Sequence, residues 1–312
     1  MVKLFLGVDG GQSSTTAVIG DETGRIAGWG SAGPCNHVSA AQARAKFLKV
    51  MSDCVSQAAA RAGLDPANPR FRAACLGMSG GPDDKATLLK EFISADDVIV
   101  THDGRIALSG AMNGGPGMIV IAGTGSIAFG ESPAGETARA GGWGYIYGDE
   151  GGAFDIARQA IRAILREHEG WGAHTALTPA LLEATKMRDA NDLMHRMYTA
   201  EWPRSRVATL ASVVDQIAES GDPVSIDLMN SAAQHLALLA AAIRRQLFRE
   251  NEPSKLAWVG GVFQSSTLLS RFRMLVELEG SVTAAPPEHA PAVGALLLAY
   301  RAAGLHVKIQ QT

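Results

Sequence analysis

Cysteine and long apolar runs are both scarce in this chain of 312 residues. Its three cysteines, Cys35, Cys54 and Cys75, form no CxxC pair, and their odd number favours reduced thiols over a disulfide framework. No segment approaches the ~20 uncharged apolar residues of a membrane-spanning helix, and the apolar run near the N-terminus meets Asp9 too soon for a signal peptide. We therefore expect a cytoplasmic protein with no membrane partner.

Neither positive nor negative charge is in large excess. The formal net charge is −3 and the pI is about 6.2, which excludes the strongly basic class of nucleic-acid binders. A small anionic ligand remains open, because backbone amides bind anions whatever the net charge. The length suggests about two domains of ~150 residues, and a hydrophobic content of 46% is enough for two cores.

Glycine, in contrast, is plentiful, and it gathers in turns that follow predicted strands. The strand Leu4–Val8 leads into the turn 9–16, and the strand Met118–Ala122 leads into Gly123–Ser126. In each turn glycines stand beside hydroxyl side chains, so backbone amides and hydroxyls can bind phosphate together. No lysine follows and a strand comes next, unlike in a Walker loop. We expect one phosphate-binding turn in each half, with a plain tight hairpin as the alternative for the first.

Strands and helices then alternate, which predicts an α/β layer with a mostly parallel sheet. Ligands of such sheets bind beyond the carboxyl ends of the strands, where Ser79 and Asp103 are placed. Asp103 could act as a general base or could simply cap a helix. The expected elements of this part are the helix Ala40–Ala62, the strand Ala73–Met78, the helix Asp84–Ile93, the strand Val98–Thr101 and the helix Ile106–Met112.

A second glycine-rich stretch, AGGWGYIYGDEGGAFD at 140–155, lies in the middle of the chain and runs into an amphipathic helical pattern. Asp149 and Glu150 lie near the end of this stretch, just before the helical pattern. His37 and His102 lack the spacing of zinc ligands, and no GxSxG elbow is present. The elements expected after this stretch are the helices Thr178–Thr185, Ala190–Tyr198, Val207–Ser220 and Leu228–Glu250, the strands Leu256–Val259 and Val282–Ala284, and the helix Pro291–Ala303.

Seven motifs occur in one order along nearly the whole chain: GVDGGQSST, PCNH, GMSGG, THDG, AGTGS, GGWGYIYGDEGGA and VGGVF. With them the chain resembles the N-acetylglucosamine kinase and BadF/BadG/BcrA/BcrD ATPase family of the actin–hexokinase–Hsp70 superfamily. The resemblance implies an α/β fold of two actin-like, ribonuclease H-like domains with a ligand cleft between them. It places the N-terminal domain at 1–112, with the helix 290–304 packing back on it, and a larger C-terminal domain with helical insertions at 113–289.

The GGWGxxxGDEG motif favours the amino-sugar kinase branch of the family. The resemblance implies transfer of the γ-phosphoryl group of ATP to the 6-hydroxyl of N-acetylglucosamine or glucosamine, with Mg²⁺ as cofactor, Asp103 as catalytic base, and a homodimer. The implied sugar-binding residues are Asn36, His37, Ser79, Asp103, Gly142, Trp143 and Asp149. The implied ATP-binding residues are Gly10, Gly11, Gln12, Ser13, Ser14, Thr15, Gly123, Thr124, Gly125, Ser126, Gly260, Gly261 and Val262, with Asp9 holding Mg²⁺ through water.

Two departures bear on this interpretation. Ile127 stands where the mammalian enzymes of the family have asparagine, which puts a preference for the N-acetyl group in question. The radical-generating activators of the family bridge an iron–sulfur cluster with cysteines of the later half. This chain has no cysteine after Cys75, which argues against an activator. A regulatory ATPase that phosphorylates no sugar is the second hypothesis, and a purely structural α/β protein is the third.

Overall fold

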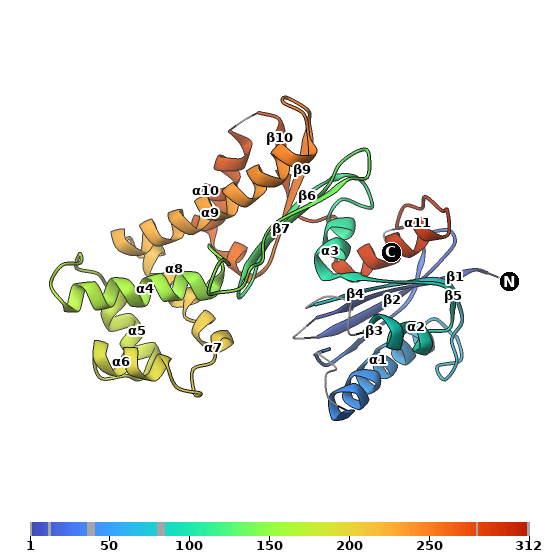
Figure 1. The fold of residues 1–312 in the computed structure, drawn as a ribbon, viewed down its shortest axis with the longest axis horizontal. Helices are drawn as coiled ribbons and strands as arrows, with labels where there is room; N and C mark the ends of the chain where they lie inside the picture. The colour runs from blue at the N-terminus through green and yellow to red at the C-terminus, as the bar shows by residue number, and fades with distance from the viewer. Residues whose placement is uncertain (1, 12–13, 36–40, 80–84, 279, 311–312) are drawn as a thin grey trace. The chain divides into compact units, whose positions relative to one another are not determined.

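The computed structural model describes residues 2–11, 14–35, 41–79, 85–278 and 280–310. The chain divides into two compact units, each built on its own five-stranded sheet (Figure 1). Unit 1 comprises Met1–Pro116 with Pro287–Thr312, and unit 2 comprises Gly117–Pro286. The boundaries expected from the sequence, after residues 112 and 289, lie within a few residues of these.

In unit 1 the strands are ordered β3-β2-β1-β4-β5, with β1–β2 and β2–β3 antiparallel and β1–β4 and β4–β5 parallel. The elements are β1 (Leu4–Gly10), β2 (Thr15–Asp21), β3 (Ile26–Ala32), α1 (Ala41–Arg61), β4 (Phe71–Met78), α2 (Ala86–Phe92), β5 (Ala95–His102), α3 (Asp103–Ala111) and α11 (Pro291–Ala302). Helix α1 covers one face of the sheet and α11 the other (Figure 1).

The last helix belongs to the first sheet because its apolar side chains complete that core. Helix α11 packs on β1, β4 and α3. Tyr300 is buried, its ring lies 4.6 Å from that of Phe5, and its hydroxyl donates to the carbonyl oxygen of Asp21 over 2.7 Å. A bulky buried side chain with a satisfied hydroxyl is a strong anchor. The two segments of unit 1 therefore share one fold.

Unit 2 repeats the pattern with the order β10-β9-β6-β7-β8, in which β6 pairs antiparallel with β7 and parallel with β9. The strands are β6 (Gly117–Ala122), β7 (Ser126–Glu131), β8 (Thr137–Gly141), β9 (Ser254–Val259) and β10 (Val282–Ala285). Strand β8 was not expected, because its sequence TARAG is polar and small. It lies at the edge of the sheet and, among the described strands, pairs with β7 alone. The two sheets confirm the expected actin-like α/β class.

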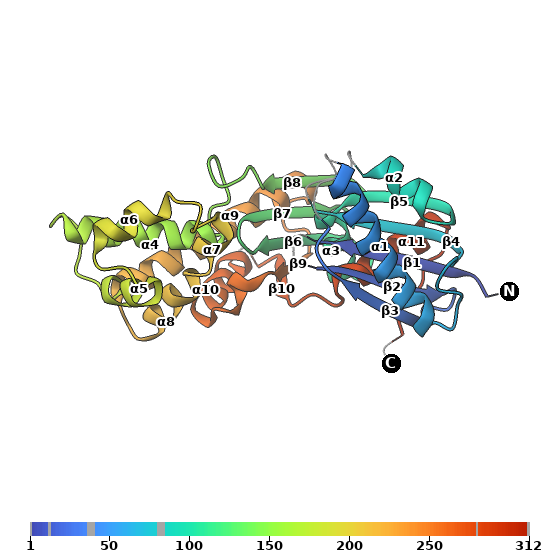
Figure 2. The same cartoon turned by 90° about the horizontal axis from the view of Figure 1, so that it is seen from below.

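The helices of unit 2 are α4 (Ala153–His168), α5 (Leu177–Thr185), α6 (Ala190–Met197), α7 (Arg204–Ala208), α8 (Ala211–Glu219), α9 (Pro223–Leu247) and α10 (Ser266–Glu277), with the short helix η1 (Gly261–Gln264). The amphipathic helix after the glycine-rich stretch is confirmed as α4. Helices α4 to α8 gather beyond one end of the sheet of this unit (Figure 2).

Three helix predictions were wrong in their bounds. Helix α3 begins at Asp103 and not at Ile106. The single helix expected at 207–220 is two helices, α7 and α8. Helix α9 begins at Pro223 and not at Leu228, because Asp222 caps it by accepting a hydrogen bond from the Ser225 amide, with proline in the first turn. Among the described helices, α9 alone has the length and apolar composition of a membrane span. It packs on β6, β7, β8 and α10, as a core helix does.

Candidate functional site

Two carboxylates stand at the same edge of the sheet in unit 1. Asp9 pairs with Gly77 of β4, and Gly77 pairs with Thr101 of β5, so the three parallel strands end together. Asp103 follows directly as the first residue of α3, half-buried, and its carboxylate accepts a hydrogen bond from the Gly104 amide over 2.8 Å. The N-cap position belongs to His102. Asp103 is therefore not the helix cap, and it lies where parallel sheets bind ligands.

Asp9 is the carboxylate most perturbed by this arrangement. Burial, and then the negative charge of Asp103, raise the pKa of Asp9 from 3.8 to about 6. Two acids that repel each other in a desolvated place are stabilised by a cation. Carboxylate oxygens are the ligands that Mg²⁺ prefers, and it usually keeps several waters. The residues present thus fit the implied Mg²⁺, with Asp9 as the group to hold it.

The first glycine turn is held together by backbone hydrogen bonds. The Gly11 amide donates to the Ser14 carbonyl, and the Cys35 amide donates to the Gly11 carbonyl, each over 3.0 Å. Gly10 ends β1, and its carbonyl accepts from the Ser79 amide over 3.0 Å, which ties Ser79 to the turn. Gln12 and Ser13 of this turn, and Asn36 and His37 of the sugar set, lie outside the described residues.

The structure assigns the Thr15 hydroxyl a structural contact. The side chain is fully buried, and its Oγ1 donates to the Gly33 carbonyl oxygen over 2.8 Å. This bond joins the start of β2 to the end of β3. The Thr15 hydroxyl thus takes part in the fold, and a contact of Thr15 with phosphate stays a prediction.

The second glycine turn, in unit 2, is wrapped by the stretch 140–155. The Ala153 and Phe154 amides, at the start of α4, donate to the carbonyls of Gly123 and Thr124 over 2.8 and 3.1 Å. The Ser126 hydroxyl is buried and donates to the Glu150 carbonyl over 2.6 Å, so this hydroxyl also holds the fold together. The loop and the start of α4 thus hold the turn through several hydrogen bonds.

Asp149 lies directly beneath this turn. It is 6% exposed, adopts a φ of 65°, and forms an ion pair with Arg204 of α7. A Cβ atom placed on Gly125 would lie 2.3 Å from Asp149 Oδ2, so only glycine fits over this carboxylate. A sugar hydroxyl was the expected partner of Asp149. The structure shows a different first partner, the Arg204 guanidinium.

The other two residues of the loop expected at the sugar differ in exposure and contact. Trp143 is 68% exposed, and the guanidinium of Arg139 lies 4.9 Å from its ring centre. Gly142 packs against Ile127: a Cβ atom on Gly142 would lie 2.4 Å from Ile127 Cδ1. Trp143 is thus an exposed aromatic side chain beside Arg139, and the loop backbone rests on the residue that departs from the family pattern.

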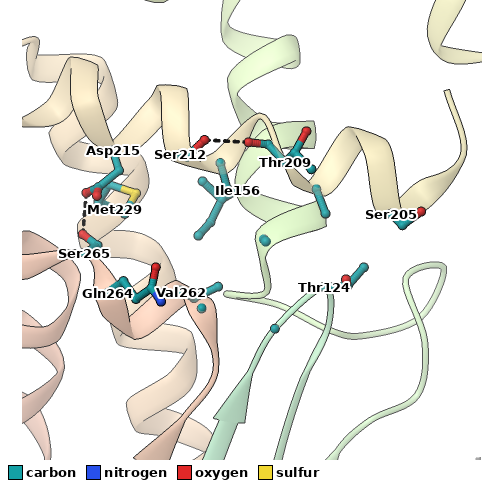
Figure 3. A pocket seen from close by; sticks show the side chains of 15 residues that line it. Thr124, Ile156, Ser205, Thr209, Ser212, Asp215, Met229, Val262, Gln264 and Ser265 are labelled. Atoms are coloured by element: carbon teal, nitrogen blue, oxygen red, sulfur yellow. Dashed lines mark hydrogen bonds between the residues drawn. The ribbon is translucent and has the colours of Figure 1, made fainter. Parts of the chain in front are cut away.

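A pocket of about 420 Å³ opens beside the second turn, entirely within unit 2 (Figure 3). Its volume falls in the range of small-molecule sites, roughly 300–1,000 Å³. Apolar side chains of α4, α8, α9 and η1 alternate with hydroxyls and one carboxylate. The lining residues are Gly123, Thr124, Ala153, Ile156, Ser205, Ala208, Thr209, Ala211, Ser212, Asp215, Met229, Gly261, Val262, Gln264 and Ser265.

The end of β9 lies close enough to the turn to form the pocket because Gly260 has no side chain. Its φ is 117°, and a Cβ atom there would lie 2.1 Å from the Ala122 carbonyl oxygen. The chain therefore crosses the end of β6, and η1 brings Gly261 and Val262 to the pocket, as the resemblance implied for ATP. An apolar slot beside a glycine turn suits a planar base with a phosphate tail.

The wall opposite η1 was missed by sequence reasoning. It comes from α7, α8 and the residues between them, and it carries Asp215, whose Oδ1 accepts a hydrogen bond from the Ser265 hydroxyl over 2.5 Å (Figure 3). Ser265 also caps α10 by accepting from the Leu268 amide over 3.1 Å. The serine pair that opens a helix was visible in the sequence. Nothing local to Asp215 marked it as a partner of that helix start.

Comparisons with known proteins agree with this geometry. The chain is 31% identical over 284 residues to an N-acetylmuramic acid/N-acetylglucosamine kinase of Clostridium acetobutylicum, covering 89% of this chain and 91% of that protein. It is 28% identical over 288 residues to an N-acetyl-D-glucosamine kinase of Dictyostelium discoideum, covering 86% and 88%. A solved Chromobacterium violaceum structure, described as an N-acetylglucosamine kinase, superposes with a TM-score of 0.75 at 27% identity, covering 95% of this chain and 99% of that one.

The family profile extends over almost the whole chain. The BadF/BadG/BcrA/BcrD ATPase profile matches residues 6–299, a range that takes in both sheets, the glycine turns and the pocket. A match of this extent assigns both units and not one fragment. The protein is a member of the BadF/BadG/BcrA/BcrD ATPase family.

Proposed function

We propose that this protein is an ATP-dependent amino-sugar kinase that transfers the γ-phosphoryl group of ATP to the 6-hydroxyl of N-acetylglucosamine or glucosamine. The kinase activities named for its relatives support this proposal. The observation that carries it is Asp103, a half-buried carboxylate at the strand edge that Asp9 shares. A carboxylate so placed can accept a proton, which a pure nucleotide-binding protein does not need.

In the proposed reaction Asp103 accepts the proton of the sugar 6-hydroxyl as its oxygen attacks the γ-phosphorus. The bond from that phosphorus to the bridging oxygen of ADP breaks, and ADP leaves with the electron pair. Bound Mg²⁺, held through water by Asp9, would neutralise phosphate charge. The backbone of the two glycine turns binds the phosphates, since positioning and electrostatic stabilisation supply most of the catalysis in this chemistry.

The sugar is assigned to the remaining residues of the expected set. These are Asn36, His37, Ser79, Gly142, Trp143 and Asp149. Trp143 is exposed and can stack on the apolar face of a sugar ring. Asp149 Oδ2 is bound by Arg204, but a carboxylate has about four lone-pair sites, so Oδ1 is the atom assigned to a sugar hydroxyl.

A substrate panel tests the proposal. The purified protein is given ATP and Mg²⁺ with N-acetylglucosamine, glucosamine, N-acetylmuramic acid, glucose or no sugar. ADP release and the mass of the sugar product are then measured. We expect ADP and sugar 6-phosphate in equal amounts, and only with an amino sugar. ADP release that is independent of sugar, without a phosphorylated product, would instead establish the regulatory ATPase.

A homodimer in the cytoplasm is the remaining part of the proposal, and it comes from the family alone. Light scattering on the eluting protein measures the molar mass directly. Twice the 32.6 kDa of one chain is the expected result, and a mass of one chain would remove the dimer from the proposal without affecting the kinase.

A further inference from the structure

The pocket and the second phosphate turn are joined by one side chain of the helical insertion. Arg204 opens α7, and the next residue, Ser205, already lines the pocket. The Nη2 atom of Arg204 donates a hydrogen bond to Asp149 Oδ2. The guanidinium carbon of Arg204 lies 5.2 Å from the ring centre of Tyr145 and 5.8 Å from that of Phe154. Both aromatic rings belong to the stretch that wraps the turn. Arg204 therefore bridges the pocket wall and the support of the turn.

Asp149 poses an electrostatic problem at this place. Its carboxylate is buried and lies against Gly125, in the middle of a turn assigned to phosphate. Two negative charges a few ångströms apart repel by several kcal/mol at the effective dielectric of a protein surface, on the order of ε ≈ 20. Unless Asp149 is neutralised, the turn would reject the anion that it is built to bind.

We infer that Arg204 is a positioning residue that neutralises Asp149 beneath the Gly123–Ser126 turn and thereby permits nucleotide phosphate to bind there. This inference rests on the proposed function, because it takes the turn as a phosphate site. Arg204 supplies the one cation that the structure describes in an ion pair with Asp149. The rings of Tyr145 and Phe154 pack against each other, with centres 5.3 Å apart, and together hold the guanidinium in place, as planar cations on ring faces are held.

The Arg204–Asp149 pair has features that destabilise the fold, which suggests that the pair is kept because it helps to bind the ligand. Within the described part of the chain, Arg204 Nε is buried and has no hydrogen-bond partner. Asp149 is held at a φ of 65°, an angle that is uncommon for residues other than glycine, although aspartate and asparagine adopt it more often than most. Unsatisfied polar groups and unusual backbone angles both destabilise a fold and gather at functional sites. A pair kept only for stability would be easier to build from apolar residues.

The experiment measures binding of two probes by calorimetry, ATP with Mg²⁺ and adenosine, which carries no phosphate. For Arg204→Gln we expect the Kd of ATP to rise about tenfold or more, while the Kd of adenosine stays within about twofold. Arg204→Lys retains the charge and should stay near the wild type for both. Arg206→Gln is the matched control, because Arg206 lies on the same helix but stacks on Trp202, 4.1 Å from its ring centre.

A second substitution distinguishes the loss of the Arg204 charge from the loss of a purely structural contact. Replacing Asp149 by Asn in the Arg204→Gln protein removes the charge that Arg204 neutralised, so ATP affinity should return to within about threefold of the wild type. Asp149→Asn alone should bind ATP at least as tightly as the wild type. An Arg204→Gln protein that binds ATP normally, or a double variant that binds no better than Arg204→Gln, would overturn the inference.

Two other results must be distinguished from a failure of this inference: a variant that does not fold, and a protein that phosphorylates no sugar. If circular dichroism shows that Arg204→Gln does not fold, the comparison is made in the Asp149→Asn background. There Arg204→Gln should leave the affinity for ATP unchanged. A further loss of ATP affinity would refute the neutralisation of Asp149 by Arg204. Binding needs no sugar turnover. A wild-type protein that phosphorylates no sugar would therefore remove the kinase proposal and leave the ATP and adenosine results to decide this one.

Discussion

Asp9 and Asp103 lie at one edge of the sheet, on either side of the end of β4, and the charge of Asp103 adds to burial in raising the pKa of Asp9 to about 6. The register produces this pair: β1 and β5 flank β4 in parallel, so residues at their carboxyl ends meet at one edge. A fold that holds two acids together without a cation is destabilised at neutral pH, which leads to the first prediction.

Asp9→Asn should stabilise the protein when Mg²⁺ and nucleotide are absent. The folded-state pKa of Asp9 lies above its usual 3.8. Its ionisation therefore costs stability, and that cost begins near pH 3.8 and is complete above about pH 6. The free energy of unfolding should rise by at most roughly 3 kcal/mol at pH 8 and by about half of that at pH 5. Urea unfolding followed by circular dichroism at both pH values measures it.

The control is Asp53→Asn, which removes an exposed carboxylate paired with Lys49 on α1. Surface pairs of this kind contribute about 0–1 kcal/mol. A gain from Asp9→Asn that is equal at the two pH values, or absent at both, would show that the carboxylate pair is not strained.

Asp103→Asn tests the proposed base. The amide keeps the size of the side chain but accepts no proton, so kcat should fall by about 10²–10⁴-fold while ATP still binds. Initial rates of sugar phosphate formation and calorimetry with ATP give the two quantities. Asp96→Asn, at the far end of the strand β5 that leads into Asp103, should turn over normally. Near-normal turnover by Asp103→Asn would remove this residue from the role of base.

Substitutions at Gly260 and Gly261 test whether the chain passes close to the end of β6 at Gly260. Gly260→Ala places a Cβ 2.1 Å from the Ala122 carbonyl oxygen at a φ of 117°, whereas a Cβ on Gly261 meets no atom within 4 Å. We expect Gly260→Ala to lower the free energy of unfolding by about 2 kcal/mol or more and Gly261→Ala to change it by less than about 1 kcal/mol. Equal effects in urea unfolding would contradict the close approach.

Asp215→Ala tests the pocket wall that came from the tertiary structure. The substitution removes the acceptor of the Ser265 hydroxyl and the one carboxylate among the residues that line the pocket. The KM for ATP should rise about tenfold, with the KM for the sugar nearly unchanged. Glu219→Gln, exposed at the end of the same helix, is the control. A larger effect on the sugar KM would place the sugar, and not the nucleotide, in this pocket.

Much of the architecture followed from local pattern. Runs of apolar residues that end in glycine and hydroxyl turns marked the strands of both sheets, because such turns need backbone angles that glycine adopts freely. Asp103 could be placed at a strand end for the same reason. The pattern did not predict β8, since an edge strand made of TARAG has no apolar alternation. It also merged α7 and α8, since both share one apolar face.

Local sequence patterns predicted most of the helices and strands in their order, and the seven motifs indicated the family. The pairs that build the site were decided by the tertiary structure: Asp149 meets Arg204 across 55 positions, and Asp215 meets Ser265 across 50. Helical and strand periodicities reach only a few residues along the chain. The partner of a buried carboxylate depends instead on how an inserted helix packs, and this is why Asp149 looked like a free sugar ligand until Arg204 was seen beside it.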